Sequence, residues 1–501
     1  LHDDYRTIKT EFFNSNYSLA FERMVYPYPM TKMYKILCSI LACMTLSVLP
    51  VSASEALHHA VSQTLPIWSV VPFVGMLLSI AIAPLINPHW WEKHMLHAAL
   101  LWSALFLIPF GIAYGFNVVS FYFLESVLLD YVPFLVLLFS LFVAAGGIVI
   151  KGTLAGTPKI NTLILFIGTA LASWIGTTGA AMLMIRPLIR ANSWRKNKVH
   201  LMVFFIFLVA NIGGSLTPLG DPPLFMGFQR GVPFTWTFHL LPILLVNLAI
   251  LFVAFFGIDT YFYKKELAAG RNPETGEEKE PIRIEGAHNF IIGVISNGML
   301  PKVCSFFADG AGIPVFEGVV FPYAITVEIV VLLAAAFLSM KTTKKETRAA
   351  NNFTFAPMEE VAKLFIGIFI TMIPALILLK VHGSELGLSK PWEMFWGTGI
   401  LSSFLDNTPT YMVFLQTAGA LGETTGIHTT VGIVSQIMLE AISAGAVFMG
   451  ANTYIGNAPN FMVKSIAEQE GIKMPSFFGY MMWSVAILIP VFIIDTFLFF
   501  L

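Results

Sequence analysis

Two stretches of the sequence combine oxygen-bearing side chains with glycine and proline inside otherwise apolar segments. They are residues 211–223 and residues 450–462. Glycine and proline are poor residues for continuing a helix. Backbone groups that a break frees at membrane depth are tolerated only where they are buried in protein or line a watery cavity. We therefore expect each stretch to be a broken helix beside a binding site.

The two stretches form a repeat with an offset of 236 residues, the separation of Thr217 and Thr453. Identical residues stand in pairs at this offset, namely Gly214 and Gly450, Thr217 and Thr453, Gly220 and Gly456, and Pro223 and Pro459. Each stretch also follows an apolar segment with a break of its own, at residues 176–181 and 406–410. Paired interrupted segments in the two halves of a chain are typical of the substrate site of a secondary transporter. The alternative is a chance match between ordinary helix kinks.

Hard monovalent cations such as Na⁺ bind oxygen atoms, and both halves offer carboxylate, hydroxyl, amide and unwound backbone oxygens near the breaks. In the first half the candidate ion-binding residues are Thr177, Thr178, Gly179, Asn211, Gly214, Thr217 and Asp221. In the second half they are Asp406, Asn407, Thr408, Asn452, Thr453 and Asn457. The threonines and asparagines could equally cap helices or form hydrogen bonds between helices, so the pattern leaves both roles open.

Ionisable side chains at membrane depth are costly, and each is a candidate for function. Asp406 is the first choice for a carboxylate that exchanges a proton for Na⁺, because burial disfavours its charged form and a bound cation favours it. Asp221 is the second choice, and Glu440 is a candidate proton relay. Both aspartates precede a possible helix start, so an N-cap is the alternative role. Arg186 could neutralise an anionic substrate or mark the cytoplasmic end of its segment.

The composition is that of a membrane protein without a catalytic or metal motif. The chain has 501 residues, is 56% hydrophobic and 12% charged, and has a mean hydropathy of +0.75. Its 29 basic and 30 acidic residues nearly balance, so nothing suggests a nucleic-acid partner. Its three cysteines, Cys38, Cys43 and Cys304, form no disulfide framework or zinc pattern. Motifs of phosphate-binding loops, zinc proteases and nucleophile elbows are missing, so we expect neither a cofactor nor an enzyme.

Apolar runs of about 20 residues, each long enough to cross a bilayer, alternate with basic loops that are expected in the cytoplasm. Residues 1–29 are interpreted as an extension or a gene-start artefact. Residues 30–53 are interpreted as a signal peptide, with an uncleaved anchor helix as the alternative. The two halves of the repeat are assigned to residues 66–263 and 318–501. Residues 264–317 between them are assigned to a linker and one weak crossing.

Basic residues stand at both ends of the broken segment 160–184, which therefore enters the membrane and returns to the same side. The corresponding segment 395–421 is followed by a loop without lysine or arginine and enters from the other side. The expected fold is an all-α polytopic membrane protein with an inverted repeat of two units. Each unit holds a re-entrant helical hairpin and a broken transmembrane helix, giving about ten crossings plus two hairpins.

At these motifs the chain resembles the ion transporter superfamily, which includes NhaD-type sodium/proton antiporters and the citrate and dicarboxylate carriers. The resemblance covers about residues 66–501, and the NhaD-like branch, some of whose members are named for citrate transport, is the nearest in pattern. The segments that carry it are residues 177–187, 211–223, 402–410 and 450–460. It implies a scaffold part, a transport part, a homodimer and elevator-like alternating access. In dicarboxylate carriers of this superfamily, Ser-Asn-Thr hairpin tips bind sodium and a carboxylate.

The hairpin tips of this chain depart from that pattern. The first tip, residues 177–179, lacks the asparagine, and the second, residues 406–408, carries Asp406. A carboxylate at the tip would repel a carboxylate substrate, so the departure favours a cation site. The leading hypothesis is therefore sodium/proton antiport across the bacterial inner membrane. The alternatives are Na⁺- or H⁺-coupled citrate or dicarboxylate transport, a membrane-embedded hydrolase and a passive channel.

Overall fold

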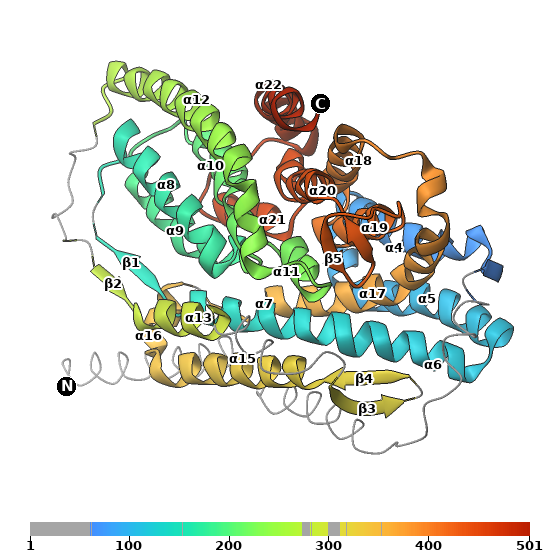
Figure 1. Cartoon of the computed structure of the whole chain (residues 1–501). Coiled ribbons are helices and arrows are strands. Elements are labelled where there is room, and N and C mark those ends of the chain that lie inside the picture. Colours follow the sequence, from blue (N-terminus) through green and yellow to red (C-terminus); the bar gives the residue numbers. More distant parts are fainter. Residues whose placement is uncertain are drawn as a thin grey trace, which may run out of the picture.

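The computed structural model describes residue 61 and residues 63–152, 154–272, 281, 283–298, 311–316, 318–351 and 353–501. The predicted extension and signal peptide, residues 1–53, lie outside the described residues. Within these described residues, nine helices are long and apolar enough to cross a membrane. The protein is an all-α polytopic membrane protein, as predicted, and its helices form two interleaved groups (Figure 1).

One group, here called the scaffold group, is built from long apolar helices that pack side by side. Its members are η1 (Ile67–Val70), α4 (Val71–Ile86), α5 (Pro88–Tyr114), α6 (Phe116–Glu125), the π-helical turn η2 (Ser126–Tyr131), α7 (Val132–Ala145), α13 (His288–Gly298), α15 (Tyr323–Thr342), α16 (Lys345–Ala350), α17 (Ala356–His382) and η5 (Gly383–Leu386). Helices α6, α7 and α15 run along the lower side of Figure 1. Asn87 caps α5 by accepting a hydrogen bond from the Trp90 amide, and Gly115, with a φ of 90°, ends it.

The other group, here called the hairpin group, contains both predicted hairpins and both broken helices. Its first-half members are α8 (Pro158–Ile175), α9 (Thr177–Ala191), α10 (Val199–Leu208), η3 (Ile212–Leu216), α11 (Pro222–Gln229), η4 (Phe234–Leu240) and α12 (Leu241–Ala268). Its second-half members are α18 (Pro391–Phe404), α19 (Asn407–Gly419), α20 (Gln436–Met449), η6 (Gly450–Asn452), α21 (Ala458–Gln469), α22 (Phe477–Asp495) and η7 (Thr496–Phe500). The halves interlock, because α11 packs against α19 and α21 packs against α9.

Three short antiparallel strand pairs lie at the ends of these helices. They are β1 (Val149–Lys151) with β2 (Arg283–Glu285), β3 (Gly312–Phe316) with β4 (Val319–Pro322), and β5 (Ile427–Thr429) with β6 (Gly432–Val434). In the first pair Lys151 lies opposite Arg283 and Val149 opposite Glu285, and Lys151 reaches diagonally to form an ion pair of 3.0 Å with Glu285. Hydrogen bonding to this lysine lowers the pKa of the Glu285 carboxyl. This pair therefore ties the end of α7 to the segment that follows α12.

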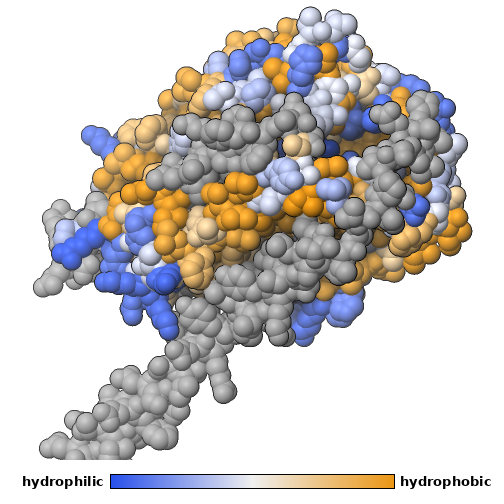
Figure 2. Space-filling model, turned by 60° about the horizontal axis from the view of Figure 1, so that its bottom comes forward, coloured by the Kyte–Doolittle hydropathy of each residue, from blue (hydrophilic) through white to orange (hydrophobic). Residues whose placement is uncertain are grey.

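Burial separates the centre of the protein from its membrane-facing surface. In the Val199–Leu216 segment 89% of the residues are buried, against 28% in the most apolar 18-residue stretch of His89–Tyr114, so α10 lies at the centre. Large exposed side chains such as Ile108 and Ile112 of α5 and Val253 of α12 point outward. On the face shown in Figure 2, hydrophobic side chains form a broad band between more hydrophilic ends. An apolar belt of this kind suits a lipid environment.

The structure corrects one boundary that the sequence predicts. The apolar run at residues 131–150 predicts one span, but this span begins earlier, because Phe116–Ala145 is one continuous helical segment with the π-turn η2 inside it. The weak crossing predicted between the two halves covers residues 288–307. Its first 11 residues form α13, and residues 299–307 lie outside the described residues, so this crossing stays a prediction.

Candidate functional site

The first hairpin turns at a glycine and is fastened to the first broken helix. Helix α8 ends at Ile175, and Gly176 has a φ of 79°, which a residue without a side chain adopts at little cost. Helix α9 then begins with Thr177, whose amide donates a 2.9 Å hydrogen bond to the Gly220 carbonyl. The tip of this hairpin therefore lies against the unwound part of its own repeat.

The second hairpin turns at Leu405 and Asp406, between α18 and α19. The Asp406 carboxylate accepts a 3.0 Å hydrogen bond from the Thr408 amide and caps α19. Asp406 is only partly buried. The alternative role that the sequence left open, an N-cap, is the contact that the structure gives Asp406.

Both broken helices are interrupted in the same way. After the 3₁₀ turns η3 and η6 the backbone is extended at Thr217 and Thr453, and it is extended again at Asp221 and Asn457. A Cβ atom on Gly220 would clash with the Gly214 carbonyl, and one on Gly456 with the Gly450 carbonyl. The repeated glycines are therefore required by a close approach of backbone to backbone.

Equivalent hydrogen bonds hold the two breaks to the two hairpins. The Thr217 hydroxyl donates to the Ser173 carbonyl, and the Thr453 hydroxyl donates to the Ser403 carbonyl at 2.5 Å. The serine hydroxyls donate in turn to backbone carbonyls that are also equivalent in the repeat. Ser173 bonds Gly213 at 2.6 Å and Ser403 bonds Met449 at 3.0 Å. The residues that repeat in the sequence therefore also make equivalent hydrogen bonds in the structure.

The two hairpin tips meet at one carboxylate, that of Asp221. Its Oδ1 accepts hydrogen bonds of 3.1 Å from the Thr177 hydroxyl and 3.1 Å from the Asn457 amide. Its Oδ2 accepts a 2.5 Å hydrogen bond from the Asn407 amide. All four side chains are at most 2% exposed. Thr177 and Asn407 are the first residues of α9 and α19, so both hairpins deliver a donor to the same group.

The residues after Asp221 explain why its carboxylate bonds Asn457 of the other half and does not cap its own helix. An N-cap side chain usually accepts from the second or third amide of its helix. Pro222 and Pro223 occupy the first two positions of α11 and have no amide hydrogen. Asn457 is in the same position, because Pro459 is the second residue of α21, and neither side chain caps its helix. Asp221 and Asn457 are free to bond each other.

An amide network continues from this group into the second broken helix. Asn457 Nδ2 also lies 3.2 Å from Asn211 Oδ1, and Asn211 Nδ2 donates to Asn460 Oδ1 at 2.7 Å. Asn460 donates in turn to the Gly450 and Thr453 carbonyls at 2.8 and 2.9 Å. These amides lock α10 and α21 together around the Asp221 carboxylate.

The other predicted residues lie around this centre without touching the Asp221 carboxylate. Thr178 is partly buried, and Gly179 packs against Ala145 of α7. Asn452 donates to Ser403 at 2.9 Å and leaves its own Oδ1 buried without a partner. Glu440 accepts from Gln436 at 2.9 Å near the start of α20, so the structure does not bring it into the site.

No positive side chain balances Asp221 in the part of the chain that the structure describes. Asp221 forms no ion pair there, and its three partners are neutral. Arg186, the predicted surrogate for anion binding, stands nine residues beyond Thr177, about 13 Å along α9 at the helical rise. Its Nη1 is buried without a partner. Within the same described residues, no cluster of three His, Cys, Asp or Glu side chains could hold a metal ion.

Comparison with known families agrees with this architecture. A family model with the description "Putative citrate transport" matches residues 62–500. The chain belongs to this family. Among curated proteins, none matches the chain significantly.

Membership of the citrate transport family establishes the broad class of the protein. It supports the predicted relation to the ion transporter superfamily, and the family description and the membrane-helical fold together indicate a multi-pass membrane transporter rather than an enzyme. The description names citrate, whereas the predicted branch was that of the sodium/proton antiporters. The finer assignment is therefore not given by the family.

Several polar residues in the neighbourhood of the site were not singled out from the sequence. Ser173, Ser403 and Asn460 hold the breaks in place; Ser403 and Asn460 lie in segments that carry the family resemblance, but none of the three was assigned a role from the sequence. The separation of Ser173 from Thr217 is 44 residues and that of Ser403 from Thr453 is 50 residues. The serines do not match at the offset of 236 residues that relates the broken helices, because the two hairpins are related by a different offset.

An ion pair crosses from the hairpin group to the scaffold group. Arg230, the C-cap of α11, donates through Nη2 to both carboxylate oxygens of Asp130, each at 2.8 Å. Asp130 lies in the π-helical turn η2, and π-turns occur frequently at functional sites. Only eight helical residues separate Asp221 from Arg230. The pair therefore links the site to the scaffold.

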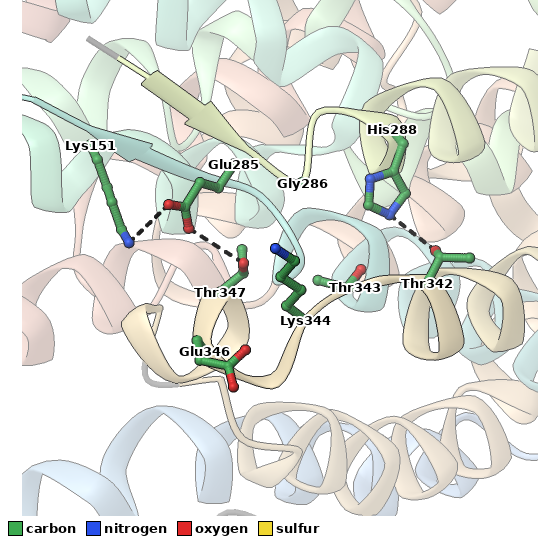
Figure 3. Close-up of a pocket in the computed structure, with 9 residues that line it drawn as sticks. All are labelled: Lys151, Glu285, Gly286, His288, Thr342, Thr343, Lys344, Glu346 and Thr347. Atoms are coloured by element: carbon green, nitrogen blue, oxygen red, sulfur yellow. Dashed lines mark hydrogen bonds and ion pairs between the residues drawn. The ribbon is translucent and has the colours of Figure 1, made fainter. Parts of the chain in front are cut away.

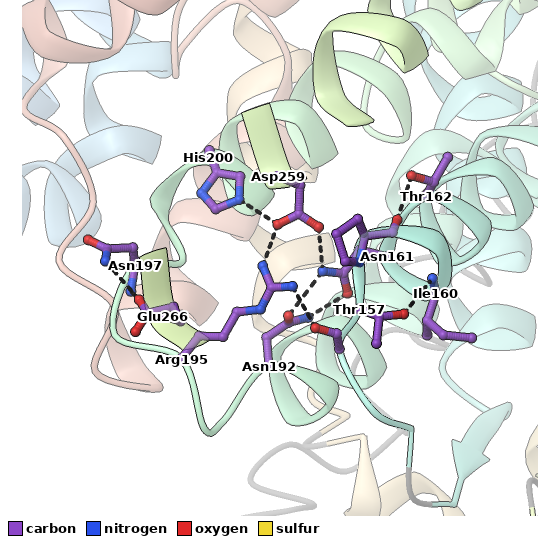
Figure 4. A network of polar contacts seen from close by, with 12 residues as sticks. Thr157, Ile160, Asn161, Thr162, Asn192, Arg195, Asn197, His200, Asp259 and Glu266 are labelled. Carbon is purple, nitrogen blue, oxygen red and sulfur yellow. Dashed lines mark hydrogen bonds and ion pairs between the residues drawn. The ribbon is translucent and has the colours of Figure 1, made fainter. Parts of the chain in front are cut away.

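A second network holds the end of the first hairpin that lies away from its tip (Figure 4). Asp259 of α12 accepts from Arg195, from His200 at 2.8 Å and from Asn161 at 2.9 Å. Arg195 was interpreted from the sequence as part of a basic loop, but it is 2% exposed. Asn161 and Asn192 also exchange hydrogen bonds of 3.0 and 2.7 Å. This network fixes α8 and α9 to α10 and α12.

A cavity of 540 Å³ lies beside the β1–β2 pair, away from the hairpin tips (Figure 3). It is lined by Lys151, Glu285, Gly286, His288, Thr342, Thr343, Lys344, Glu346 and Thr347. Positively charged lysines and negatively charged glutamates both line it. None of the lining residues belongs to the site around Asp221.

Proposed function

We propose that the protein is a cation-coupled secondary transporter in which Asp221 holds the transported cation. The observation that carries this proposal is the convergence of both hairpin tips on one buried carboxylate that has only neutral partners. An ionised carboxylate without a positive partner is costly in a medium of low dielectric constant. A proton or a metal cation would remove that cost, so the two compete for the same group.

The oxygens around Asp221 suit a hard cation such as Na⁺. Thr177 offers a hydroxyl oxygen, and Asn407 and Asn211 offer amide oxygens next to the carboxylate. Rotation of the Asn407 amide by half a turn would present its oxygen in place of the Nδ2 that now donates. Asp221, Thr177, Asn407 and Asn457 come from four different helices of the two halves. Binding of a cation between them would therefore tie both hairpins to both breaks.

The first candidate reaction is exchange of Na⁺ for H⁺. A carboxylate solute at the tips would meet Asp221 and Asp406 and would find no bonded lysine or arginine among the described residues there. In the proposed cycle Asp221 releases its proton on one side, binds Na⁺ there, and takes up a proton again when Na⁺ leaves on the other side. Alternating access by movement of the hairpin group against the scaffold group would separate the two sides.

The second candidate reaction is uptake of citrate together with a cation. The family description favours it. In this case the cation at Asp221 would lie between the Asp221 carboxylate and the carboxylates of citrate. Its positive charge would then attract citrate to a site that is otherwise negative. The two candidates share the cation site and differ in what moves with the cation.

One experiment separates the two reactions. The purified protein is reconstituted in liposomes that contain a pH dye, with an acidic lumen, and Na⁺ is added outside. Rapid alkalinisation without citrate is expected for antiport, and it should be lost in Asp221→Asn. Na⁺-dependent uptake of labelled citrate, with no proton movement under Na⁺ alone, would replace antiport by citrate transport. Transport that survives Asp221→Asn in full would overturn the proposed site.

A further inference from the structure

A second acidic side chain is buried in the hairpin group, between α12 and α22. Asp495 is the last residue of α22, and Asn247 of α12 faces it; both are 0% exposed. Asn247 Nδ2 donates to Asp495 Oδ1 at 2.9 Å and to Oδ2 at 2.8 Å. It also donates to the Ile243 carbonyl at 2.9 Å. One amide group is thus the whole hydrogen-bond support that the described residues give this carboxyl.

The charged residues of the neighbouring elements do not compensate Asp495. Helix α12 and η6 pack against α22, and α18 packs against η7, which follows Asp495. The first charged residue of α12 after Asn247 is Asp259, about 18 Å along the helix. At the start of α18, Lys390 is exposed, and the partly buried Glu393 accepts from backbone amides. Turn η6 has no charged residue, and within the described chain Asp495 forms no ion pair.

The oxygen atoms of this pair outnumber the hydrogens that reach them. Both Asp495 oxygens and the Ile243 carbonyl share the two hydrogens of one NH₂ group, and Asn247 Oδ1 is buried without a partner. By contrast, Asp221 has three separate donors, and Asp259 has Arg195 and His200 besides an amide. The cost of burying an ionised, unpaired carboxylate exceeds what hydrogen bonds from one neutral amide return. One more hydrogen, bound to the Asp495 carboxylate, would remove this deficit.

We propose that Asp495, supported by Asn247, is a second proton-binding site of the protein and is neutral at physiological pH. The carboxylate takes up one proton to become a carboxyl group, and no other bond changes. A metal ion fits less well, because hard cations take about six oxygens. The pair offers three, and the nearby Thr496 hydroxyl is already engaged with Phe492 at 2.8 Å and Trp396 at 2.9 Å.

The position of Asp495 gives this proton a role in transport, a step that rests on the proposed function. Helix α12 packs against α8, α10 and η3, and α22 packs against η6, so both belong to the group that holds Asp221. A proton bound to Asp495 would therefore move with the cation site. It would keep the buried charge of the moving group low whichever ion Asp221 carries.

Infrared difference spectroscopy of the purified, reconstituted protein tests the inference directly. Wild-type protein at neutral pH should show a carbonyl band of a protonated carboxyl group that is absent from Asp495→Asn. The same loss should occur in an Asp221→Asn background, which removes any contribution of Asp221. Glu393→Gln, which removes a carboxylate that already accepts two backbone hydrogen bonds, is the matched control and should leave the band intact. Asn247→Leu should keep the band and shift the pH at which it disappears, since it removes the remaining donor.

Two results would overturn the assignment. Identical carboxyl bands in wild type and Asp495→Asn would show that Asp495 is ionised. A Na⁺-dependent change of a carboxylate band that Asp495→Asn abolishes would show a metal site instead. Asp495→Asn replaces a neutral carboxyl by an amide of nearly the same shape, so it should fold, and thermal unfolding verifies this. Because the spectra require no turnover, a failure of transport in liposomes would overturn only the proposed function.

Discussion

Asp221 and Asn457 occupy equivalent positions of the two repeats, and their side chains bond each other at 3.1 Å. A contact between equivalent residues places the axis that relates the two units at this point. Several groups near it are present twice, once from each unit, as the paired hairpin tips Thr177 and Asn407 show. The charge is present only once, because only one of the two equivalent residues is an aspartate. A single carboxylate on the axis is accessible in turn from either unit.

Removal of the Asp221 charge is expected to abolish the effect of Na⁺ on stability. A ligand that binds only the folded state stabilises it by about 2.7 kcal/mol at 100 times its dissociation constant. Wild-type protein in detergent should therefore unfold at a higher temperature as Na⁺ replaces choline. Asp221→Asn should lose this dependence while unfolding at a similar temperature without Na⁺.

Asp406→Asn is the matched control for that measurement. It keeps a capping side chain on α19, so the Na⁺ dependence should persist and stability should fall by less than about 1 kcal/mol. If Asp406→Asn lost the Na⁺ effect and Asp221→Asn kept it, the cation site would have to be assigned to the second hairpin tip.

A transfer of the carboxylate across the axis should restore binding. In Asp221→Asn/Asn457→Asp the charge stands on the other unit but in the same contact. We expect the double variant to regain Na⁺-dependent stabilisation, with an affinity within about tenfold of wild type, or 1.4 kcal/mol. Asn457→Asp alone puts two carboxylates in contact, and these cannot both ionise without a cation between them. Its stability in the absence of Na⁺ should therefore fall as the pH rises. A double variant that is as insensitive to Na⁺ as Asp221→Asn would show that the axis position is not sufficient.

The fold class and the two helix breaks could be predicted from the sequence. Glycine and proline at a constant offset mark the breaks, because both residues interrupt a helix. The sequence ranks Asp406 above Asp221 as the exchanging carboxylate, whereas the structure brings both hairpin tips to Asp221. Asp406 precedes Asn-Thr, which supplies an amide to cap, whereas Asp221 precedes two prolines, which cannot. Asp130 and Arg230 are 100 residues apart and their pairing depends on how the groups pack, which no local pattern records.

The Asp130–Arg230 pair should stabilise the conformation described above. Its side chains are 9% and 21% exposed, and loss of one partner leaves the other charge largely buried. Asp130→Asn and Arg230→Gln should each lower the stability by about 2 kcal/mol or more, and the double variant should lose less than the sum. Thermal unfolding of the four proteins gives the coupling energy. If the hairpin group moves past the scaffold, the single variants should also change the transport rate. Additive losses in stability would mean that the pair contributes no coupling.

The paired threonines offer the most direct test of the repeat. Thr217 and Thr453 make the same bond to Ser173 and Ser403, and both hydroxyls are fully buried. Truncation to alanine leaves a buried carbonyl without its donor, at a cost of about 1–3 kcal/mol, and the cost should be similar at both sites. Thr→Ser retains the hydroxyl and should recover most of the loss, which separates the hydrogen bond from the methyl group. The break itself is held by this bond, so the alanine variants should also weaken Na⁺-dependent stabilisation, whereas the serine variants should not. A large effect at one threonine and none at its partner would show that the two breaks, although alike in sequence, are held by different contacts.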